Sequence, residues 1–119
     1  DLIILDVPCS GLGVIAKKPG IKYNQNLENI RNLIDLQYRL LEKGASLLKV
    51  GGILQYSTCT INPEENEKNI EKFLAKFNNF SILSYSTFDE FIYKEKYFAS
   101  FPFKNKCDGA FGAFLRRIK

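Results

Sequence analysis

Hydrophobic and polar residues follow two different patterns in the first half of the chain. Residues 2–5 form a short, uninterrupted apolar run, which is typical of a parallel strand buried on both faces. A proline and two glycines within residues 6–13 then predict a loop. Over residues 27–48, apolar side chains recur at near-helical spacing, which predicts an amphipathic helix. Gly44 is a candidate position for a break in this helix.

A second strand and a second helix are predicted after the glycine pair at positions 51–52, which ends the first helix. Residues 53–57 have the composition of a strand. Asn62, Pro63 and Glu65 predict a helix start, with the asparagine as N-cap, the proline at the first helical position and the glutamate in a variant of the capping box. The acidic residues expected to complement the dipole of this helix are Glu64, Glu65 and Glu67. Its buried stripe is expected to contain Ile70, Phe73, Leu74 and Phe77.

The last third of the chain is less regular. Residues 80–85 predict a short strand, residues 87–106 show no clean period and are predicted to be a loop, and residues 110–118 predict a final strand. Strands that alternate with helices predict an α/β fold with parallel strands and right-handed crossovers. Ligands of such sheets bind beyond the carboxyl ends of the strands. Cys9 and Cys59 both follow a predicted strand, so we expect their loops to lie side by side.

Composition limits the class of protein. The chain has 119 residues, of which 45% are hydrophobic, and this is enough for one domain with a single core. No apolar run approaches the roughly 20 residues needed to span a bilayer, and residues 1–6 lack the basic start of a signal peptide. Three cysteines without CxxC spacing argue against a disulfide framework and against a four-cysteine zinc site. We therefore expect a cytoplasmic protein that does not contact a membrane.

Charge and two absent residue types narrow the chemistry further. Seventeen Lys and Arg against 13 Asp and Glu give a formal charge of +4, which suits a polyanionic partner. Because the chain has no histidine, a Cys-His or Ser-His-Asp arrangement and any histidine-containing metal site are excluded, and no metal site is predicted. The chain has no methionine and opens in a strand-like run, so we expect it to be part of a longer protein.

The position of Cys59 suggests chemical reactivity. It lies three residues before the expected N-cap Asn62, where free backbone N–H groups and a helix dipole would favour a thiolate. Alternatively, Cys9 and Cys59 are small buried hydrophobic residues, which is the commoner role of a lone cysteine. The pattern alone leaves both interpretations open.

Three motifs resemble those of the Nop/Sun family of RNA (cytosine-5) methyltransferases. DVPCSGLG at residues 6–13 is similar to the family's DAPCSG loop, YSTCTINPEENE at residues 56–67 to its YSTCT…NPEENE block, and DGAF at residues 108–111 to its closing DGFF strand. They occur in the family's order and spacing. Residues 13–23 look most like the bacterial Sun branch, the 16S ribosomal RNA cytosine-5 methyltransferase B enzymes. The departures from that branch's pattern are Lys17, Lys18, Gly20 and Tyr23.

This resemblance implies a fold and an activity. Residues 1–119 would be a partial methyltransferase catalytic domain, the C-terminal half of a Rossmann-like class I sheet that uses S-adenosyl-L-methionine, with parallel strands and a final antiparallel strand. The half that carries the cofactor loop, and any N-terminal RNA-binding domain, would be absent, so the chain alone is expected to be inactive. The implied reaction is methylation of C5 of a cytosine in RNA, with small-subunit ribosomal RNA as the expected substrate.

The resemblance also implies roles for individual residues. Cys59 would attack C6 of the cytosine as nucleophile, and Cys9 would assist release of the product. Asp6 would accept hydrogen bonds from the cytosine amino edge or border the cofactor, although from the residues alone it could also be a loop cap ahead of Pro8. Pro8 would stiffen the loop, and Gly11 and Gly13 would permit close backbone approach to a flipped base, although these could equally be turn residues.

Independently of the resemblance, Lys17, Lys18 and Lys22 interleave with Tyr23, a pattern that suits phosphate contact and base stacking, although a short charge run is more often a solvated face. In contrast, Cys107 matches no motif and is expected to be structural and remote from the other two cysteines.

Two other functions remain open from the residues alone. Two strand-end cysteines could form the reversible disulfide of a thiol redox protein, although CxxC is missing and this leaves the block at residues 56–67 without a role. The basic balance and the aromatic content could also belong to a non-catalytic RNA-binding module, although such a module would be expected to have lost Cys59. Neither pattern predicts an oligomeric state.

Overall fold

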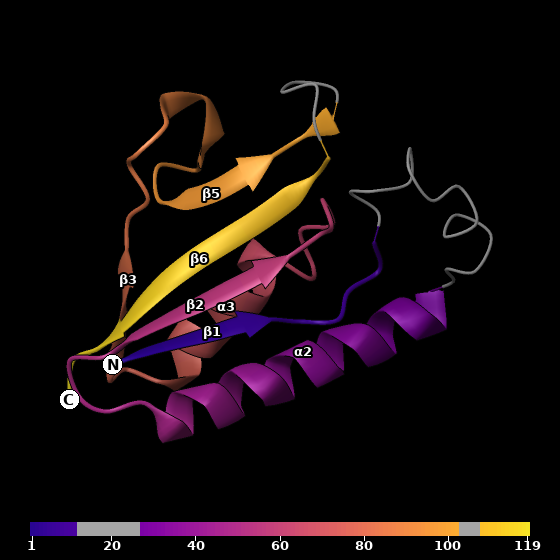
Figure 1. Cartoon of the computed structure of the whole chain (residues 1–119). Helices are drawn as coiled ribbons and strands as arrows, with labels where there is room; N and C mark the ends of the chain where they lie inside the picture. Colours follow the sequence, from indigo (N-terminus) through magenta and orange to yellow (C-terminus); the bar gives the residue numbers. More distant parts are fainter. Residues whose placement is uncertain (12–26, 103–107) are drawn as a thin grey trace.

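The computed structural model of the chain describes residues 1–11, 27–102 and 108–119. A six-stranded sheet forms the centre of the molecule, and two helices pack on it (Figure 1). The elements in chain order are β1 (Leu2–Asp6), α2 (Leu27–Leu47), β2 (Ile53–Thr58), α3 (Glu67–Lys76), β3 (Phe80–Leu83), the short 3₁₀ helix η2 (Asp89–Phe91), β4 (Ile92–Tyr93), β5 (Tyr97–Ser100) and β6 (Ala110–Arg117).

The sheet is mixed, and its strand order is β1-β2-β6-β5-β4. β1 and β2 are parallel, with Asp6 opposite Ser57, whereas β6 runs antiparallel to β2. β3 and β5 pair with successive parts of the other edge of β6, at residues 114–117 and 110–112. The predicted α/β fold, with parallel strands and a closing antiparallel strand, is confirmed.

The prediction that residues 87–106 form a loop is wrong for the part that the structure describes. That part contains η2 and the antiparallel hairpin of β4 and β5. The hairpin turns at Lys94 and Glu95, whose φ angles are 51° and 69°. Tight hairpin turns with positive φ normally carry glycine or asparagine. Because two other residues stand here, and because β4 has only two residues, the sequence lacks the usual signal for a hairpin.

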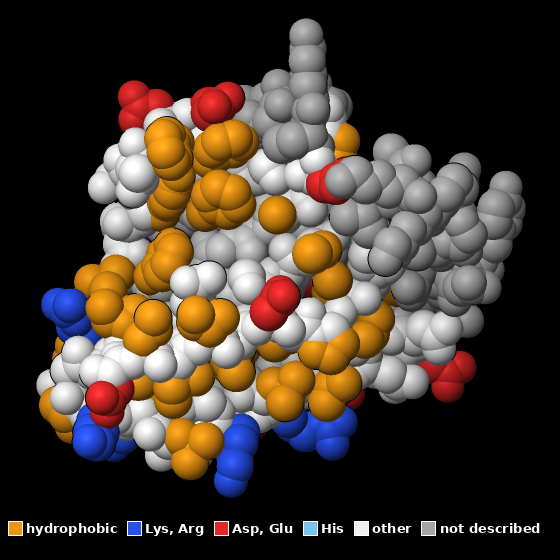
Figure 2. Space-filling model, viewed as in Figure 1, with side chains coloured by type: hydrophobic (Ala, Val, Ile, Leu, Met, Phe, Trp, Pro, Cys, Tyr) orange, Lys and Arg blue, Asp and Glu red, His pale blue; other side chains and the backbone are white. Residues whose placement is uncertain are grey.

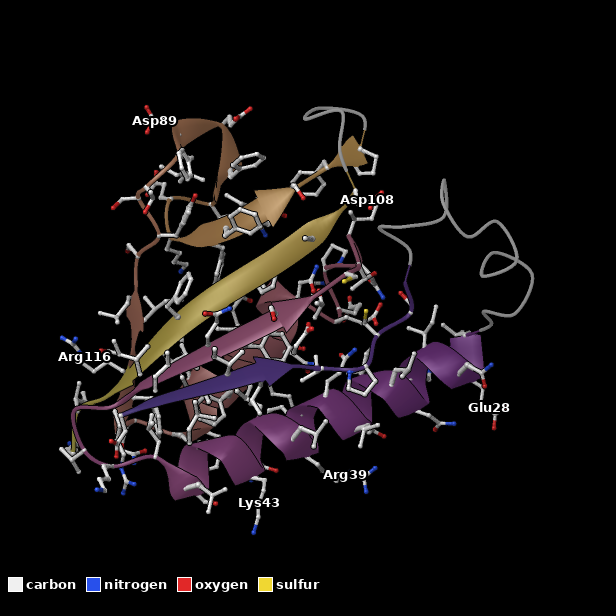
Figure 3. The ribbon with its side chains drawn as sticks, viewed as in Figure 1. Glu28, Arg39, Lys43, Asp89, Asp108 and Arg116 are labelled. Carbon is white, nitrogen blue, oxygen red and sulfur yellow. The ribbon has the colours of Figure 1, made fainter. Side chains whose placement is uncertain are left out.

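Helix α2 is continuous, so the break considered at Gly44 is wrong. The glycine instead allows the helix to lie close to the sheet. A Cβ atom at this position would come within 2.9 Å of Leu5 Cδ1 and 3.3 Å of Leu54 Cδ1, which is closer than ordinary contact. On the opposite side of the helix, Arg39 and Lys43 project away from the sheet (Figure 3). The glycine therefore brings α2 against the strands that lead to Cys9 and Cys59.

Strand β1 is not buried on both faces, contrary to the prediction. Leu2 and Ile4 are each 60% exposed, whereas Ile3 and Leu5 are partly buried against the core. α2 covers the face that carries Ile3 and Leu5, and apolar side chains are visible on the other face (Figure 2). The apolar run specifies a strand, but which faces are covered depends on elements elsewhere in the protein.

The core lies between the helices and the sheet. Leu41 from α2, Phe73 from α3, and Leu54 and Leu115 from the central strands are fully buried. The predicted stripe of α3 is confirmed, since Ile70 and Phe73 are buried and Leu74 and Phe77 pack against the core. No helix within the described ranges combines the length and apolar character needed to cross a membrane.

Truncation of a core side chain tests this packing. Leu41→Ala should lower the free energy of unfolding by about 2–5 kcal/mol, because it removes apolar contacts and leaves a cavity. Leu36→Ala is the control, since Leu36 lies on the same helix but is 37% exposed. Chemical denaturation of the two variants measures the difference. An equal loss of stability in both would contradict the placement of Leu41 in the core.

Candidate active site

The loops that carry Cys9 and Cys59 meet at the carboxyl ends of β1 and β2. The parallel pairing ends with the Val7 backbone N–H donating to the Ser57 carbonyl oxygen at 3.1 Å. Two residues after Val7 and Ser57, in the loops that follow the strands, the backbone N–H of Cys59 donates to Sγ of Cys9 at 3.3 Å. The predicted juxtaposition of the two cysteine loops is therefore confirmed.

The two thiols differ in their surroundings. Cys59 is exposed, whereas Cys9 is partly buried. Burial raises the pKa of the Cys9 thiol, and the negative charges of Cys59 and Glu65 raise it further. Backbone N–H groups of Cys59 and Gly11 act in the opposite direction, but the net shift is upward. Cys9 therefore holds its proton at neutral pH, and Cys59 is the thiol that a ligand can reach directly.

Helix α3 begins later than predicted. Its first residue is Glu67, and a turn over residues 63–66 precedes it. Asn62 caps this turn rather than a helix, because its Oδ1 accepts the backbone N–H of Glu64 at 3.2 Å. The helix N-terminus is thus not beside Cys59, and the expected effect of a helix dipole on this thiol is not supported.

Glu65 was predicted to cap the helix, and this is also wrong. Its side chain is fully buried and points instead toward the two cysteine loops. The carboxylate accepts five hydrogen bonds from a set of neutral donors: Ser10 N, Ser10 Oγ, Gln37 Nε2, Thr60 Oγ1 and Asn62 Nδ2. Two of these partners, Ser10 and Gln37, lie far from Glu65 in the sequence, so the carboxylate is engaged in tertiary contacts rather than in a helix cap. The signal available in the sequence was the position of Glu65 inside the block similar to NPEENE.

Further buried polar groups support the same loops. Thr58 Oγ1 donates to Asn66 Oδ1 at 2.6 Å, and Asn66 Nδ2 donates to the Thr60 carbonyl oxygen at 2.9 Å. The Tyr56 hydroxyl donates to the Glu65 carbonyl oxygen at 2.6 Å, and burial raises the pKa of this tyrosine far above its ordinary value. The backbone on both sides of Cys59 is therefore held by hydrogen bonds that involve buried side chains.

Other predicted site residues lie at the same edge of the sheet or outside the described part of the chain. Asp6 is exposed at the end of β1, and Ser57 Oγ donates to its Oδ1 at 3.3 Å. Pro8 is exposed, and its carbonyl oxygen accepts Gln37 Nε2 from α2 at 2.8 Å. The remaining predicted residues, Lys17, Lys18, Lys22, Tyr23 and Cys107, lie outside the described residues.

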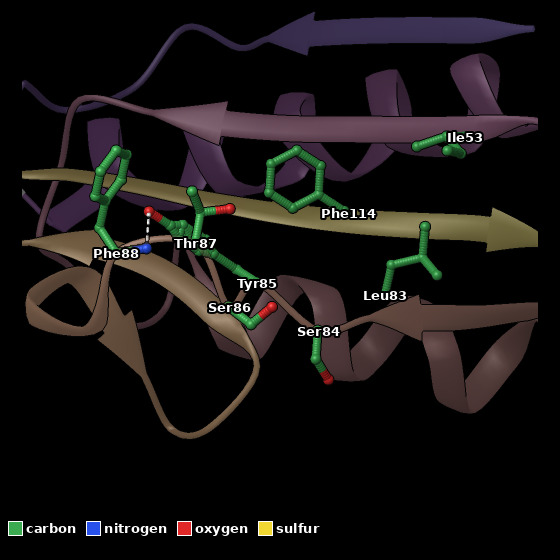
Figure 4. A pocket seen from close by; sticks show the side chains of 8 residues that line it. All are labelled: Ile53, Leu83, Ser84, Tyr85, Ser86, Thr87, Phe88 and Phe114. Carbon is green, nitrogen blue, oxygen red and sulfur yellow. Dashed lines mark hydrogen bonds between the residues drawn. The ribbon is translucent and has the colours of Figure 1, made fainter.

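A cavity of about 380 Å³ lies elsewhere, beside β3 and β6 (Figure 4). Tyr85, Phe88 and Phe114 are among the residues that line it, and the Phe88 backbone N–H donates to the Tyr85 hydroxyl at 3.2 Å. Neither cysteine and none of their hydrogen-bond partners lines this cavity. It is therefore separate from the site formed by the cysteine loops.

Comparison with known proteins identifies the family. The family model described as 16S rRNA methyltransferase RsmB/F matches residues 1–116. The chain belongs to this family. The predicted membership of the Nop/Sun group is thereby confirmed.

Individual relatives support the assignment. The chain is 51% identical over 74 residues to the probable ribosomal RNA small subunit methyltransferase B of Synechocystis, covering 62% of this chain and 17% of that protein. It is 47% identical over 74 residues to the tRNA (cytosine(34)-C(5))-methyltransferase of Drosophila melanogaster, covering 62% of this chain and 10% of that protein. The chain thus spans less than a fifth of either relative.

A solved structure shows the same fold. NSun6 from Pyrococcus horikoshii, determined with SFG, superposes with a TM-score of 0.82 at 33% sequence identity. The match covers 98% of this chain and 30% of that one. The mixed sheet and the two helices are therefore those of a known member of the Sun group.

Proposed function

We propose that the protein containing this chain methylates C5 of a cytosine in RNA through a covalent bond between Cys59 and C6. The observation that carries the proposal is the meeting of the two motif cysteines at one sheet edge, with Cys59 exposed and its backbone N–H bonded to Cys9 Sγ. Family membership supports the reaction class.

The first step is attack by Cys59. C5 of cytosine is a poor nucleophile, and addition of the Cys59 thiolate to C6 forms an S–C bond that makes C5 an enamine-like carbon. The exposed position of Cys59 lets a flipped base approach its sulfur. When bound, S-adenosyl-L-methionine supplies a methyl group on a positively charged sulfur, which keeps the electron pair of the broken bond.

The second step is release, which we assign to Cys9. The proton on C5 passes to the Cys9 thiolate, the electrons of that C–H bond re-form the C5–C6 double bond, and the Cys59 sulfur leaves as a thiolate. The raised pKa of Cys9 makes its thiolate scarce at neutral pH but a strong proton acceptor when present. Release should therefore become faster as the pH rises toward that pKa.

Three further residues complete the proposal. The exposed carboxylate of Asp6 suits hydrogen bonds from an amino or hydroxyl group, whether on the cytosine or on the cofactor. We also assign a rigid wall of the base pocket to Pro8 and a phosphate contact to Lys18. The glycine-rich cofactor loop has no counterpart in the chain, so most contacts to the cofactor must come from other segments of the protein.

The proposed substrate is small-subunit ribosomal RNA, and the proposed location is the cytoplasm. The family description and the Synechocystis relative name ribosomal RNA, although the Drosophila relative is named for tRNA. Both names agree on RNA as the methyl acceptor. The choice between them requires mapping of the modified cytosine.

Methyl transfer tests the proposal directly. A full-length enzyme containing this segment should transfer labelled methyl groups to small-subunit ribosomal RNA, and bisulfite sequencing should map them to C5 of cytosine. Transfer RNA is the comparison substrate, and preferential methylation of it would change the proposed substrate but not the reaction. RNA binding without methyl transfer would favour a non-catalytic module, and a disulfide between Cys9 and Cys59 that forms and breaks during turnover would favour a redox protein.

A further inference from the structure

Glu65 and Glu67 are two buried glutamates with different partners. Glu67 is 2% exposed, and its Oε2 accepts the Tyr93 hydroxyl at 2.6 Å and pairs with Lys94 Nζ at 3.0 Å. These partners belong to the hairpin of β4 and β5. Glu65 faces the cysteine loops instead, so the two residues provide a matched comparison between a carboxylate near the thiols and one that links α3 to the hairpin.

The Glu65 carboxylate is bonded to the residue that directly follows each cysteine. Ser10 follows Cys9, and it donates its backbone N–H to Oε1 at 2.8 Å and its hydroxyl to Oε2 at 2.7 Å. Thr60 follows Cys59, and its hydroxyl donates to the same Oε2 at 3.3 Å. The Ser10 and Thr60 hydroxyl oxygens also lie 2.9 Å apart. One carboxylate therefore sets the spacing of both cysteine loops.

Two more bonds hold the carboxylate itself. Gln37 Nε2 from α2 donates to Oε1 at 3.1 Å and also to the Pro8 carbonyl oxygen at 2.8 Å. Asn62 Nδ2 donates to Oε2 at 3.0 Å. The ion pairs found within the described residues involve other carboxylates, so the charge of Glu65 is balanced there by oriented neutral donors.

We propose that Glu65 is a positioning residue that holds Cys9 and Cys59 in register for the two steps of the reaction. This inference rests on the proposed function. A carboxylate suits the role because all five bonds come from donors, and a side chain that carries its own N–H group would place a donor against them. The shorter side chain of aspartate, with one methylene fewer, would also hold its carboxylate too far from both loops.

The charge of Glu65 has a second effect on Cys9. The groups that act on this thiol are the charges of Cys59 and Glu65 and the backbone N–H groups of Cys59 and Gly11, in addition to burial. Because the negative charge of Glu65 disfavours a second negative charge nearby, its removal should lower the pKa of Cys9. A shift of the Cys9 pKa on removal of this charge therefore distinguishes Glu65 from a residue that only maintains the fold.

The test compares Glu65→Gln with the matched control Glu67→Gln in a full-length enzyme. We expect Glu65→Gln to lower kcat about 100-fold with little change in KM for RNA, because a displacement of about 1 Å at a reacting group can cost this much. The same variant should have a larger thiolate fraction at Cys9, which favours release, but the loss of alignment should outweigh this gain. Glu67→Gln should retain the wild-type kcat.

A second readout does not require activity. The rates at which iodoacetamide alkylates Cys9 and Cys59 are followed against pH by mass spectrometry of the corresponding peptides. In Glu65→Gln, the profile of Cys9 should move to lower pH, whereas in Glu67→Gln both profiles should match the wild type. Circular dichroism tests whether each variant is folded.

The outcomes separate the two proposals. If the wild-type enzyme methylates no RNA, the proposed function fails, and the role of Glu65 is decided by the alkylation profiles alone. Wild-type profiles and wild-type kcat in Glu65→Gln would overturn the positioning role. If Glu65→Gln does not fold, Ser10→Ala removes the hydroxyl that bonds to Glu65 and Thr60 but leaves the carboxylate, and kcat should fall about tenfold. An unchanged kcat in that variant would equally overturn the role.

Discussion

Replacement of Cys59 by alanine should abolish methylation and leave no covalent protein–RNA species. Without a thiolate at this position, C5 of the cytosine is not activated, and a methyl group has no nucleophile to accept it. The expected loss is the largest of any substitution at the site, at least about 10⁴-fold, because removal of a nucleophile removes the reaction path itself. Labelled methyl transfer to RNA in the full-length enzyme measures the rate, and a denaturing gel with labelled RNA measures the adduct.

The control for this variant must show that the loop is intact. Cys59→Ala keeps the backbone N–H that donates to Cys9 Sγ, so the neighbouring thiol should keep its position. Because the charge of Cys59 is lost, the pKa of Cys9 should fall and its alkylation by iodoacetamide should move to lower pH, and an unchanged circular dichroism spectrum would show that the fold is intact. Methylation at the wild-type rate in Cys59→Ala would rule out a covalent mechanism through this residue.

The parts of the fold that local patterns specify were predictable. β2, α2 and the juxtaposition of Cys9 with Cys59 follow from periodicity and from the pairing of neighbouring parallel strands. The exposure of Leu2 and Ile4 was not predictable, because an apolar run does not indicate which faces of the strand are covered by other elements. For the same reason, the sequence could not show that Gly44 serves a close approach rather than a helix break.

The chemistry of the site was only partly predictable. The two cysteines stand out because they follow strands and match family motifs, but Glu65 has a local explanation as a capping residue. Two of its partners, Ser10 and Gln37, lie 55 and 28 residues away in the sequence. A pattern read over a few residues favours the capping interpretation, and only the fold reveals the tertiary hydrogen bonds.

Replacement of Cys9 by alanine should have a different effect from replacement of Cys59. With Cys59 intact, attack on C6 and methyl transfer can proceed, but no group is placed to accept the C5 proton. The methylated adduct should then accumulate, because the Cys59–C6 bond cannot break until that proton leaves. A protein–RNA complex that resists denaturation should appear on a gel when both RNA and S-adenosyl-L-methionine are supplied.

The two cysteine variants are compared on the same gel, and the variant that traps RNA identifies the residue needed for release. Cys9→Ala should trap most of the enzyme as adduct, whereas the wild type should show little, and the double variant Cys9→Ala with Cys59→Ala should show none. The trap should also depend on pH less than wild-type release does, because the thiol whose pKa is raised by burial is absent. If Cys59→Ala traps RNA and Cys9→Ala does not, the roles are reversed and Cys9 is the nucleophile. Because Cys9 is the less exposed thiol, that result would also require its loop to move before it could reach a base.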